Sequence, residues 1–341
     1  MESAKEQRKA TLKDVAARVG VSKMAVSVVL GGDRSSHVRV SDRTRARILE
    51  VAHEMGYRPH AVARSLRRRS TNIIGLYCGY GYLNARLPFL AEIIGGLQEA
   101  CDQHQKDLLL HGVFRGQSVE SIYQELANGS IDGLVIHAPP NDPLVDRLAE
   151  SPLPVVAIGD AIPALPSVVV DDIGGSYLIA DYLIAKGHRH ILYRNSPPRL
   201  SLAAVQRRRT AFVEAVEADG LEVIDWTGEE QTDAHDPTLF PCLDRARDER
   251  PTVAVCWNDR AAYDMLAHCL ARRLPVPEDF AIIGFDGIGT PLDRIWKLTT
   301  VRAPWAQVAQ TAIKLLVAQI AGEPIAQETV LPVELVCGNT A

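Results

Sequence analysis

The sequence predicts a small all-α head, built around a helix-turn-helix, joined to a larger α/β body of two doubly wound parallel-sheet lobes. In residues 11–56 apolar residues recur at helical spacing between glycines, whereas from residue 72 onward short apolar runs alternate with helical stretches. The charge follows the same division, since residues 1–70 carry 16 Lys and Arg against 7 Asp and Glu, and residues 71–341 carry 21 against 35. A basic head on an acidic body indicates that the head alone contacts a polyanion.

The head begins with a predicted helix over residues 12–19. Thr11 stands before it and Asp14 follows three residues later, which is the capping-box arrangement of a helix start. Gly20 ends this helix, because glycine adopts a left-handed conformation without steric cost. Apolar residues at positions i, i+3, i+4 and i+7 form its inward face: Leu12, Val15, Ala16 and Val19.

A second short helix follows, capped by Ser22. Its inward residues are Val26, Val29 and Leu30, and the opposite face carries Lys23, Met24, Ser27 and Val28. Two short helices joined by a glycine-containing turn are typical of a helix-turn-helix, whose second helix lies in the DNA major groove. An ordinary helical hairpin is the alternative interpretation of this spacing.

A third helix completes the head and a basic segment follows it. Ser41 caps this helix, Gly56 ends it, and its predicted apolar face holds Thr44, Ile48, Val51, Ala52 and Met55. The arginines of residues 61–70 (AVARSLRRRS) repel one another, so we expect a helix there only when phosphates neutralise their charge. A plain basic linker is the alternative. The predicted domains are a head at 11–58, a hinge helix and linker at 59–71, and a body at 72–341.

In the body, buried strands alternate with helices. Near-continuous apolar runs of this kind imply a parallel sheet covered on both faces. Ten or so strand–helix units exceed one sheet, so two lobes are expected, with a ligand cleft where the carboxyl ends of their strands face each other. The predicted strands are NIIGLYC, DLLLHGV, GLVIHA, PVVAIGD, SVVVDD, HILYR, TVAVCWN and FAIIGFD, and the predicted helices span 88–104, 117–128, 143–150, 174–186, 201–219 and 259–272.

Several function classes receive no support from the sequence. The polar N-terminus is unlike a signal peptide and no apolar stretch approaches membrane-spanning length, so we expect a cytoplasmic protein without a membrane partner. No metal-spaced cluster, nucleophile elbow, P-loop or dinucleotide fingerprint occurs, so no cofactor, metal or catalytic residue is expected. The scattered cysteines indicate buried thiols: Cys78, Cys101, Cys242, Cys256, Cys269 and Cys337.

Seven segments together resemble the LacI/GalR family of transcription regulators, in the order and at the spacing of that family. The resemblance covers about residues 11–336. It implies a head that binds the operator major groove, a hinge helix that enters the minor groove, and a body like a periplasmic sugar-binding protein that senses a small molecule. The segments are TLKDVAARVGVSKMAVSVVL, VSDRTRARILEVAHEMGYRPH, AVARSL, VVVDDIGGSYLIADYLIAKGHRHI, CWNDRAAYDML, VPEDFAIIGFDG and LTTVRAPWAQVAQTAIKLL.

The resemblance also implies DNA-contacting residues. Lys23, Met24 and Val28 match the base-contacting positions, and Lys23 can donate to guanine O6 and N7. Many family members carry Arg or His where this chain has Val28, so the operators of relatives cannot be assumed. Thr11, Ser22 and Ser27 suit phosphate contacts. In the hinge, Leu66 matches the residue that wedges between base steps, with Ala63 and Arg64 alongside.

The same resemblance implies an effector site of five residues. They are Arg208, Asn258, Asp286, Trp257 and Trp305. A guanidinium, an amide, a carboxylate and an aromatic face together suit a polyol, so a sugar or sugar derivative is the expected effector. Alternatives remain for three of them: Arg208 on a solvated helix face, Trp305 in the core, and Asp286 as a cap of the following turn.

The sequence therefore predicts an effector-controlled transcription regulator, and the family's usual mode is repression. A palindromic operator requires a two-fold protein, so a homodimer is expected. An extracytoplasmic sugar-binding protein and a sugar-active enzyme are the competing classes. The basic head argues against the first, and the lack of a catalytic motif argues against the second.

Overall fold

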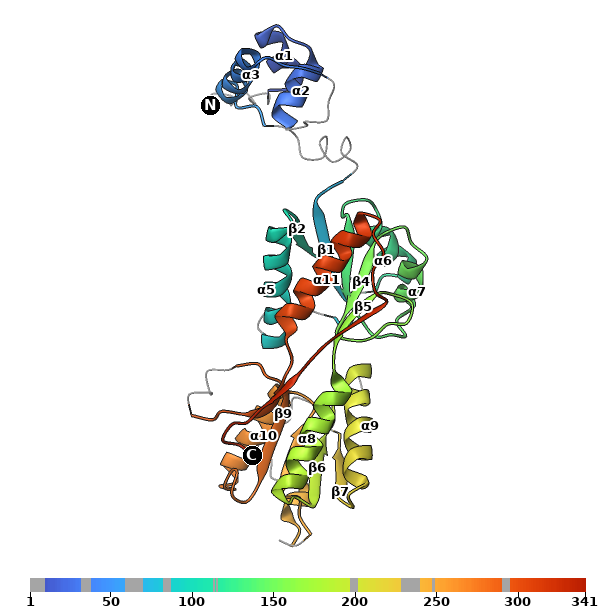
Figure 1. Cartoon of the computed structure of the whole chain (residues 1–341), viewed down its shortest axis with the longest axis vertical. Helices are drawn as coiled ribbons and strands as arrows, with labels where there is room; N and C mark the ends of the chain where they lie inside the picture. The colour runs from blue at the N-terminus through green and yellow to red at the C-terminus, as the bar shows by residue number, and fades with distance from the viewer. Residues whose placement is uncertain are drawn as a thin grey trace, which may run out of the picture. The chain divides into compact units, whose positions relative to one another are not determined.

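The structure is a computed structural model. It describes residues 10–31, 38–58, 70–81, 87–112, 114, 116–196, 202–227, 240–246, 249–289 and 295–341. The chain divides into two compact units, Met1–Thr71 and Asn72–Ala341, whose elements Figure 1 labels.

The first unit holds three helices, as predicted. They are α1 (Leu12–Val19), α2 (Lys23–Gly31) and α3 (Asp42–Glu54). The capping box of Thr11 and Asp14 is formed, and Gly20 ends α1 with a φ of 77°. The predicted inward faces meet in one core, in which Val15, Val26, Ile48 and Val51 are fully buried. Each helix thus buries the stripe that its periodicity indicates.

One expectation for α2 is wrong. Ser27 and Val28 were expected on the exposed face, but they are only 7% and 8% exposed. The physical reason is that burial depends on what packs around α2 and not on its periodicity alone, and only its first turn is open to solvent. Lys23 and Met24 in that turn are exposed.

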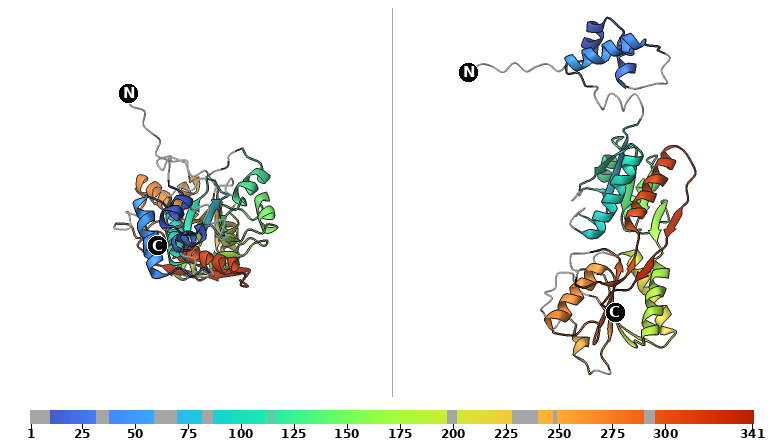
Figure 2. Two further views of the ribbon diagram at one scale, coloured as in Figure 1. Left: turned by 90° about the horizontal axis from the view of Figure 1, so that it is seen from above. Right: turned by 60° about the vertical axis from the view of Figure 1, so that its left-hand side comes forward.

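The second unit consists of two lobes, each built on a six-stranded sheet. The sheet of the first lobe has the order β11-β5-β4-β3-β1-β2, and all its pairings are parallel. Its strands are β1 (Ile73–Cys78), β2 (Asp107–Leu110), β3 (Gly133–His137), β4 (Val155–Ile158), β5 (Ser167–Val170) and β11 (Glu328–Leu331). Its helices are α5 (Pro88–Gln103), α6 (Val119–Leu126), α7 (Pro143–Ala149) and α11 (Trp305–Ile320). Helices α5 and α11 lie side by side, as Figure 2 shows, and α11 packs on β3, β4 and β5.

The sheet of the second lobe has the order β12-β10-β9-β8-β6-β7. Its strands are β6 (His190–Arg194), β7 (Glu222–Trp226), β8 (Val253–Cys256), β9 (Ala281–Asp286), β10 (Thr299–Arg302) and β12 (Glu334–Val336). Its helices are α8 (Asp172–Lys186), α9 (Ala203–Glu217) and α10 (Asp259–Ala271). Helix α8 packs against α9, β10 and β12, while α10 packs against β8 and β9.

Both faces of each sheet are covered, which explains why the strands are nearly continuous apolar runs. Alternate residues of one strand enter different cores. In β3, Val135 faces the core under α5 and α11, whereas Leu134 and Ile136 face the core under α6 and α7. In β8, Val255 enters the core under α8 and α9, and Ala254 the core under α10.

The chain passes between the lobes three times within the described residues. It leaves the first lobe between β5 and α8, returns between β10 and α11, and leaves again between β11 and β12. The first-lobe strand β11 and the second-lobe strand β12 are therefore separated by only two residues. These connections hold the strand ends of the two lobes toward a common cavity.

The predicted strands and helices are present, but four further strands escaped the sequence patterns. Three of them, β7, β11 and β12, lie at sheet edges, where alternation with polar residues replaces the continuous apolar run. Strand β12 is antiparallel to β10, a departure from the purely parallel sheet expected. Across the described part of the chain, no helix is both long enough and apolar enough to cross a membrane.

Candidate functional site

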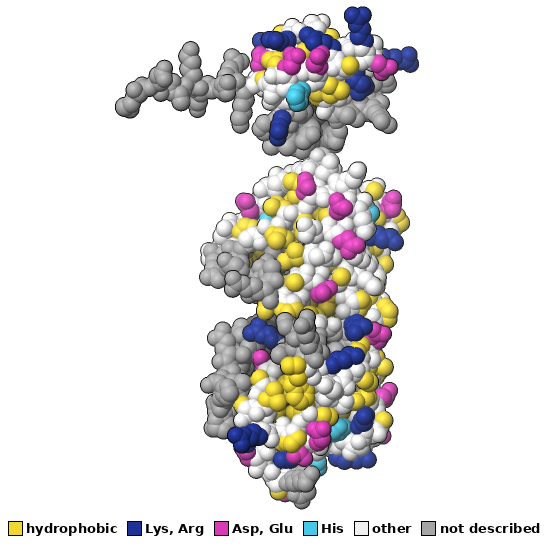
Figure 3. Space-filling view, turned by 90° about the vertical axis from the view of Figure 1, so that its left-hand side faces the viewer, with side chains coloured by type: hydrophobic (Ala, Val, Ile, Leu, Met, Phe, Trp, Pro, Cys, Tyr) yellow, Lys and Arg dark blue, Asp and Glu magenta, His cyan; other side chains and the backbone are white. Residues whose placement is uncertain are grey.

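The head presents its polar residues around the start of α2. Ser22 caps this helix, since its Oγ accepts from the backbone N–H of Ala25 at 3.1 Å. Lys23 and Met24 follow in the first turn, and Met24 is 58% exposed. Lys and Arg side chains are visible on the surface of the head in Figure 3. A helix N-terminus with exposed N–H groups and a cation is suited to phosphate and base edges.

The other predicted DNA-contacting residues differ in their setting. Thr11 is exposed, but its hydroxyl is engaged in the capping box, donating to Asp14 Oδ2 at 2.7 Å. Ser27 and Val28 are buried, as described above. Ala63, Arg64 and Leu66 lie outside the described residues.

A cavity of about 550 Å³ lies between the two lobes of the body. All five predicted effector residues line it: Arg208, Asn258, Asp286, Trp257 and Trp305. They come from α9, the segment after β8, the end of β9 and the start of α11. Segments far apart in the sequence therefore converge on one concave surface, as ligand sites of doubly wound sheets do.

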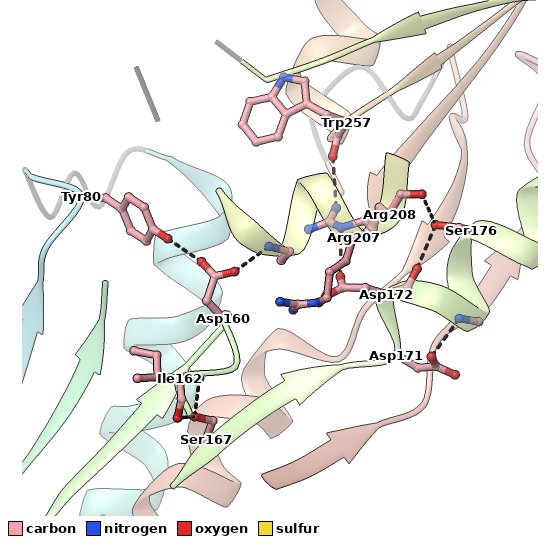
Figure 4. A network of polar contacts seen from close by, with 12 residues as sticks. Tyr80, Asp160, Ile162, Ser167, Asp171, Asp172, Ser176, Arg207, Arg208 and Trp257 are labelled. Atoms are coloured by element: carbon pink, nitrogen blue, oxygen red, sulfur yellow. Dashed lines mark hydrogen bonds and ion pairs between the residues drawn. The ribbon is translucent and has the colours of Figure 1, made fainter. Parts of the chain in front are cut away.

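Arg208 is held by an extensive set of contacts (Figure 4). Its Nε lies 2.9 Å from Asp172 Oδ1, and an Nη donates to the carbonyl of Trp257 at 3.1 Å. The guanidinium stacks on the ring of Phe285, 3.9 Å from its centroid. Arg208 is only 7% exposed, so the alternative of a solvated helix face is wrong for this residue. These contacts fix the orientation of its guanidinium in the structure.

Asp172 is the counter-charge of two arginines. It is 3% exposed and also accepts from Arg207 at 2.9 Å. Burial raises the pKa of the Asp172 carboxyl, and the adjacent Arg208 and Arg207 oppose that rise. Ser176 reinforces the arrangement by donating to the backbone carbonyls of Asp172 and Arg208, both at 2.9 Å.

Asp286 places a second carboxyl at the cavity. It ends β9 with a φ of 126° and is 8% exposed. Burial raises its pKa well above the usual range, Arg208 opposes the rise and Asp259 adds to it. A carboxyl whose ionisation is disfavoured can both donate and accept hydrogen bonds at a ligand hydroxyl.

Asn258 and Trp305, two further predicted residues, line the same cavity. Asn258 caps α10, with its Oδ1 accepting from the N–H of Ala261 at 2.8 Å, so its amide NH₂ is the group left for a ligand. Trp305, the first residue of α11, is 4% exposed and belongs both to the core and to the cavity lining. Trp305 is therefore a core residue, as the alternative interpretation stated, and it also lines the cavity.

The sequence analysis missed several polar lining residues, among them Asp160 and Tyr80. Asp160 follows β4, accepts from the hydroxyl of Tyr80, and accepts from the N–H of Ala204 at 2.6 Å. Figure 4 shows this carboxylate between the two lobes. Asp160 ends the apolar run PVVAIGD, so the rule that ligands lie at carboxyl ends of strands would have found it. Tyr80 gives no comparable pattern in the sequence. Within the described residues, no group of three or more His, Cys, Asp and Glu is suited to a metal ion.

A helix-turn-helix head and a two-lobed body with a cavity between the lobes are features of DNA-binding regulators that respond to a small ligand. The lacI family model of bacterial regulatory proteins matches residues 11–60, and the periplasmic binding protein-like domain matches residues 180–341. The chain is 30% identical over 319 residues to the HTH-type transcriptional repressor PurR of Vibrio cholerae strain N16961, covering 91% of each chain. It is 27% identical to PurR of Mannheimia succiniciproducens, covering 94% of this chain and 95% of that one. The chain belongs to the lacI family of DNA-binding transcription regulators.

Solved structures show the same architecture. The lac repressor bound to ONPG matches with a TM-score of 0.80 at 23% identity, covering 98% of this chain and all of that one. A complex of the transcriptional regulator CelR with cellobiose matches with a TM-score of 0.67 at 26% identity, covering 97% and 100%. The expected fold, a helix-turn-helix head with two parallel-sheet lobes, is confirmed.

Proposed function

We propose that this chain is a repressor whose affinity for operator DNA is set by a sugar or sugar derivative bound between the lobes. The observation that carries the proposal is the cavity, where Arg208, Asp286 and Asn258 present donors and acceptors beside tryptophan rings. Hydroxyl groups satisfy such donors and acceptors, and the apolar face of a sugar ring packs on an aromatic side chain. The cellobiose complex of CelR is consistent with this ligand class.

The DNA-binding part of the proposal rests on α2 and the hinge. Lys23 and Met24 are exposed and contact base edges, while Thr11 and Ser22 contact phosphates. Ser27 and Val28 are buried, so they contact DNA only if the packing around them changes on binding. Leu66 wedges between base steps, with Ala63 and Arg64 beside it. Two such heads on a homodimer bind a palindromic operator in the cytoplasm, where the DNA is.

The function is tested in two steps with the full chain. Selection from a pool of random duplexes should yield a palindromic site, and anisotropy titrations should show far tighter binding to it than to random duplex. A thermal-shift screen of sugars, uronates and nucleosides should then identify a compound that raises the melting temperature of the chain. A ligand at 100 times its Kd adds about 2.7 kcal/mol to the free energy of unfolding. Failure to enrich any duplex would contradict the regulator. A chain that responds to none of these compounds would contradict the effector class.

A further inference from the structure

The first lobe faces the cavity with a continuous row of four rings. Tyr80 and His137 have centroids 4.7 Å apart, His137 and Phe89 are 5.6 Å apart, and Phe89 meets Trp305 edge-on at 4.8 Å. All four residues line the cavity. We call Tyr80, His137, Phe89 and Trp305 the aromatic wall.

Four separate segments build the aromatic wall. Tyr80 follows β1, Phe89 lies in the first turn of α5, His137 ends β3, and Trp305 begins α11. Gly159 is adapted to this packing, because a Cβ atom there would lie 3.0 Å from the His137 ring. The wall belongs entirely to the first lobe.

Two polar groups of the aromatic wall are engaged within the protein. The Tyr80 hydroxyl donates to Asp160, whose other oxygen accepts from Ala204. His137 Nδ1 donates to the carbonyl of Ile158 at 3.0 Å, and burial lowers the pKa of its imidazole. The ring is therefore neutral at neutral pH, and Nε2 is an acceptor on the edge that the Ile158 contact leaves open.

The second lobe faces the same cavity with a different chemistry. Arg208, Asn258, Asp259, Arg260, Asp264 and Asp286 line it from that side. Among the described lining residues of the first lobe, Asp160 is the only charged side chain, and both its oxygens have partners. Trp257 and Tyr263 add two rings on the second-lobe side. The charged groups of the cavity thus lie mainly on the second lobe, whereas the first lobe presents mainly rings.

We propose that the effector is a glycoside with a planar unsaturated aglycone, its sugar ring against the second lobe and its flat ring on the aromatic wall. This inference rests on the proposed sugar effector and narrows it. A single sugar ring covers about one aromatic side chain, whereas the wall extends over four. Sugar hydroxyls buried against it would find few partners, because the Tyr80 hydroxyl, Asp160 and His137 Nδ1 are already hydrogen-bonded within the protein. A planar ring stacks on such a surface without that penalty, and His137 Nε2 accepts from a donor on it.

The test compares free sugars with their own glycosides by calorimetric titration of the full chain. The probes are glucose, galactose and xylose against their phenyl β-glycosides, and ribose against adenosine and uridine. At least one glycoside should bind ten-fold or more tightly than its free sugar. The phenyl and nucleoside arms distinguish the two sources of the planar ring.

Variants of cavity residues then show which side chain provides the higher affinity for the glycoside. Phe89→Ala should bring glycoside affinity to within about three-fold of the free sugar and leave the free sugar within three-fold of its original value. Ile288→Ala, which removes an apolar side chain on the second-lobe side, is the matched control and should not reduce the glycoside advantage selectively. If Phe89→Ala does not fold, Phe89→Leu replaces it, because leucine keeps most of the apolar volume and removes the ring. Free sugars that bind as tightly as their glycosides would overturn this inference and leave the proposed function standing. Lack of binding by every probe would overturn both.

Discussion

At the scale of single residues, the cavity is organised by buried charges that satisfy one another. Arg208 and Asp172 are 7% and 3% exposed, and each is held by further contacts. Burying either charge alone would be costly, whereas a paired and hydrogen-bonded charge is tolerated. The same residues therefore serve the stability of the second lobe and the chemistry of the cavity.

Arg208→Ala should destabilise the protein by about 3–5 kcal/mol, because it leaves Asp172 buried with only Arg207. Arg207→Ala is the matched control. The Arg207 side chain is 34% exposed, so its loss should cost about 1 kcal/mol or less and preserve the effector response. Chemical denaturation of both variants measures the difference. Equal losses would mean that Arg208 has no special structural role.

Asp286→Asn should stabilise the chain at neutral pH. The folded-state pKa of Asp286 is raised, so the native state retains a proton that the unfolded state releases, and stability declines as pH rises above about 4. The asparagine amide does not ionise, so this loss of stability disappears in the variant. The melting temperature should rise by about 2–4 °C for each kcal/mol gained in the free energy of unfolding. Thermal melts from pH 4 to 8 measure the gap between variant and parent, which should widen with pH. A gap that is constant with pH would contradict the raised pKa.

At the scale of elements, helix α9 is capped from the other lobe. Its own N-cap residue, Leu202, provides no side-chain hydrogen bond. Asp160, 44 residues earlier in the chain, accepts from the N–H of Ala204 instead. A carboxylate at a helix N-terminus is stabilising, and here it also ties the first lobe to the second.

Asp160→Ala should lower stability by about 0.5–2 kcal/mol and shift the lobes toward an open arrangement. Asp142→Ala is the control, because Asp142 caps α7 within the first lobe, accepting from Leu144 at 2.9 Å. Both variants should lose comparable stability in denaturation. Small-angle scattering should show a larger radius of gyration only for Asp160→Ala, and an unchanged radius would mean that Asp160 does not hold the lobes together.

Mutations in α2 and in the hinge should have different effects on DNA binding. Lys23→Ala should relax preference at one symmetric pair of base positions, costing about 1–3 kcal/mol against the preferred sequence. Leu66→Ala should weaken specific binding yet leave the salt slope nearly unchanged, since the slope counts neutralised phosphates. Titrations of operator and random duplex at several salt concentrations measure both effects. A Leu66→Ala protein that binds and bends the operator like the parent would show that the hinge is only a basic linker.

At the scale of the whole molecule, the proposed function requires that a small ligand influence a separate DNA-binding unit. Three chain crossings join the lobes, and they lead directly into α8, α11 and β12. A change in the angle between the lobes would therefore act on these three elements. If effector and operator are coupled, each changes the affinity of the other by the same factor, typically about 1–3 kcal/mol. A dimer would carry this change to two heads at once.

The chain should be a homodimer in solution. A palindromic operator needs two heads related by a two-fold axis, and the acidic body offers the surface for their pairing. On the face drawn in Figure 3, the body shows acidic and basic side chains interspersed with apolar ones. Light scattering at micromolar concentration should give twice the monomer mass of 37.3 kDa. A monomer or a tetramer would contradict the two-fold arrangement.

The sequence by itself determined the features that depend on local pattern. The Thr11–Asp14 capping box, the buried stripes of α1 and α3 and the apolar strands follow from periodicities of 3.6 and 2 within short segments. Arg208, Asn258 and Asp286 were assigned to the cavity by the family resemblance, and the last two also follow apolar strands, whose carboxyl ends converge there.

Tertiary structure alone decided what depends on residues distant in the sequence. Burial of Ser27 and Val28 depends on what covers α2, which its own pattern does not encode. The cap of α9 comes from Asp160 in the other lobe, and the edge strand β12 pairs only because the chain returns to β10. The aromatic wall joins four segments whose sequences show no common motif. Local patterns determine which elements form, whereas long-range packing determines which side chains meet.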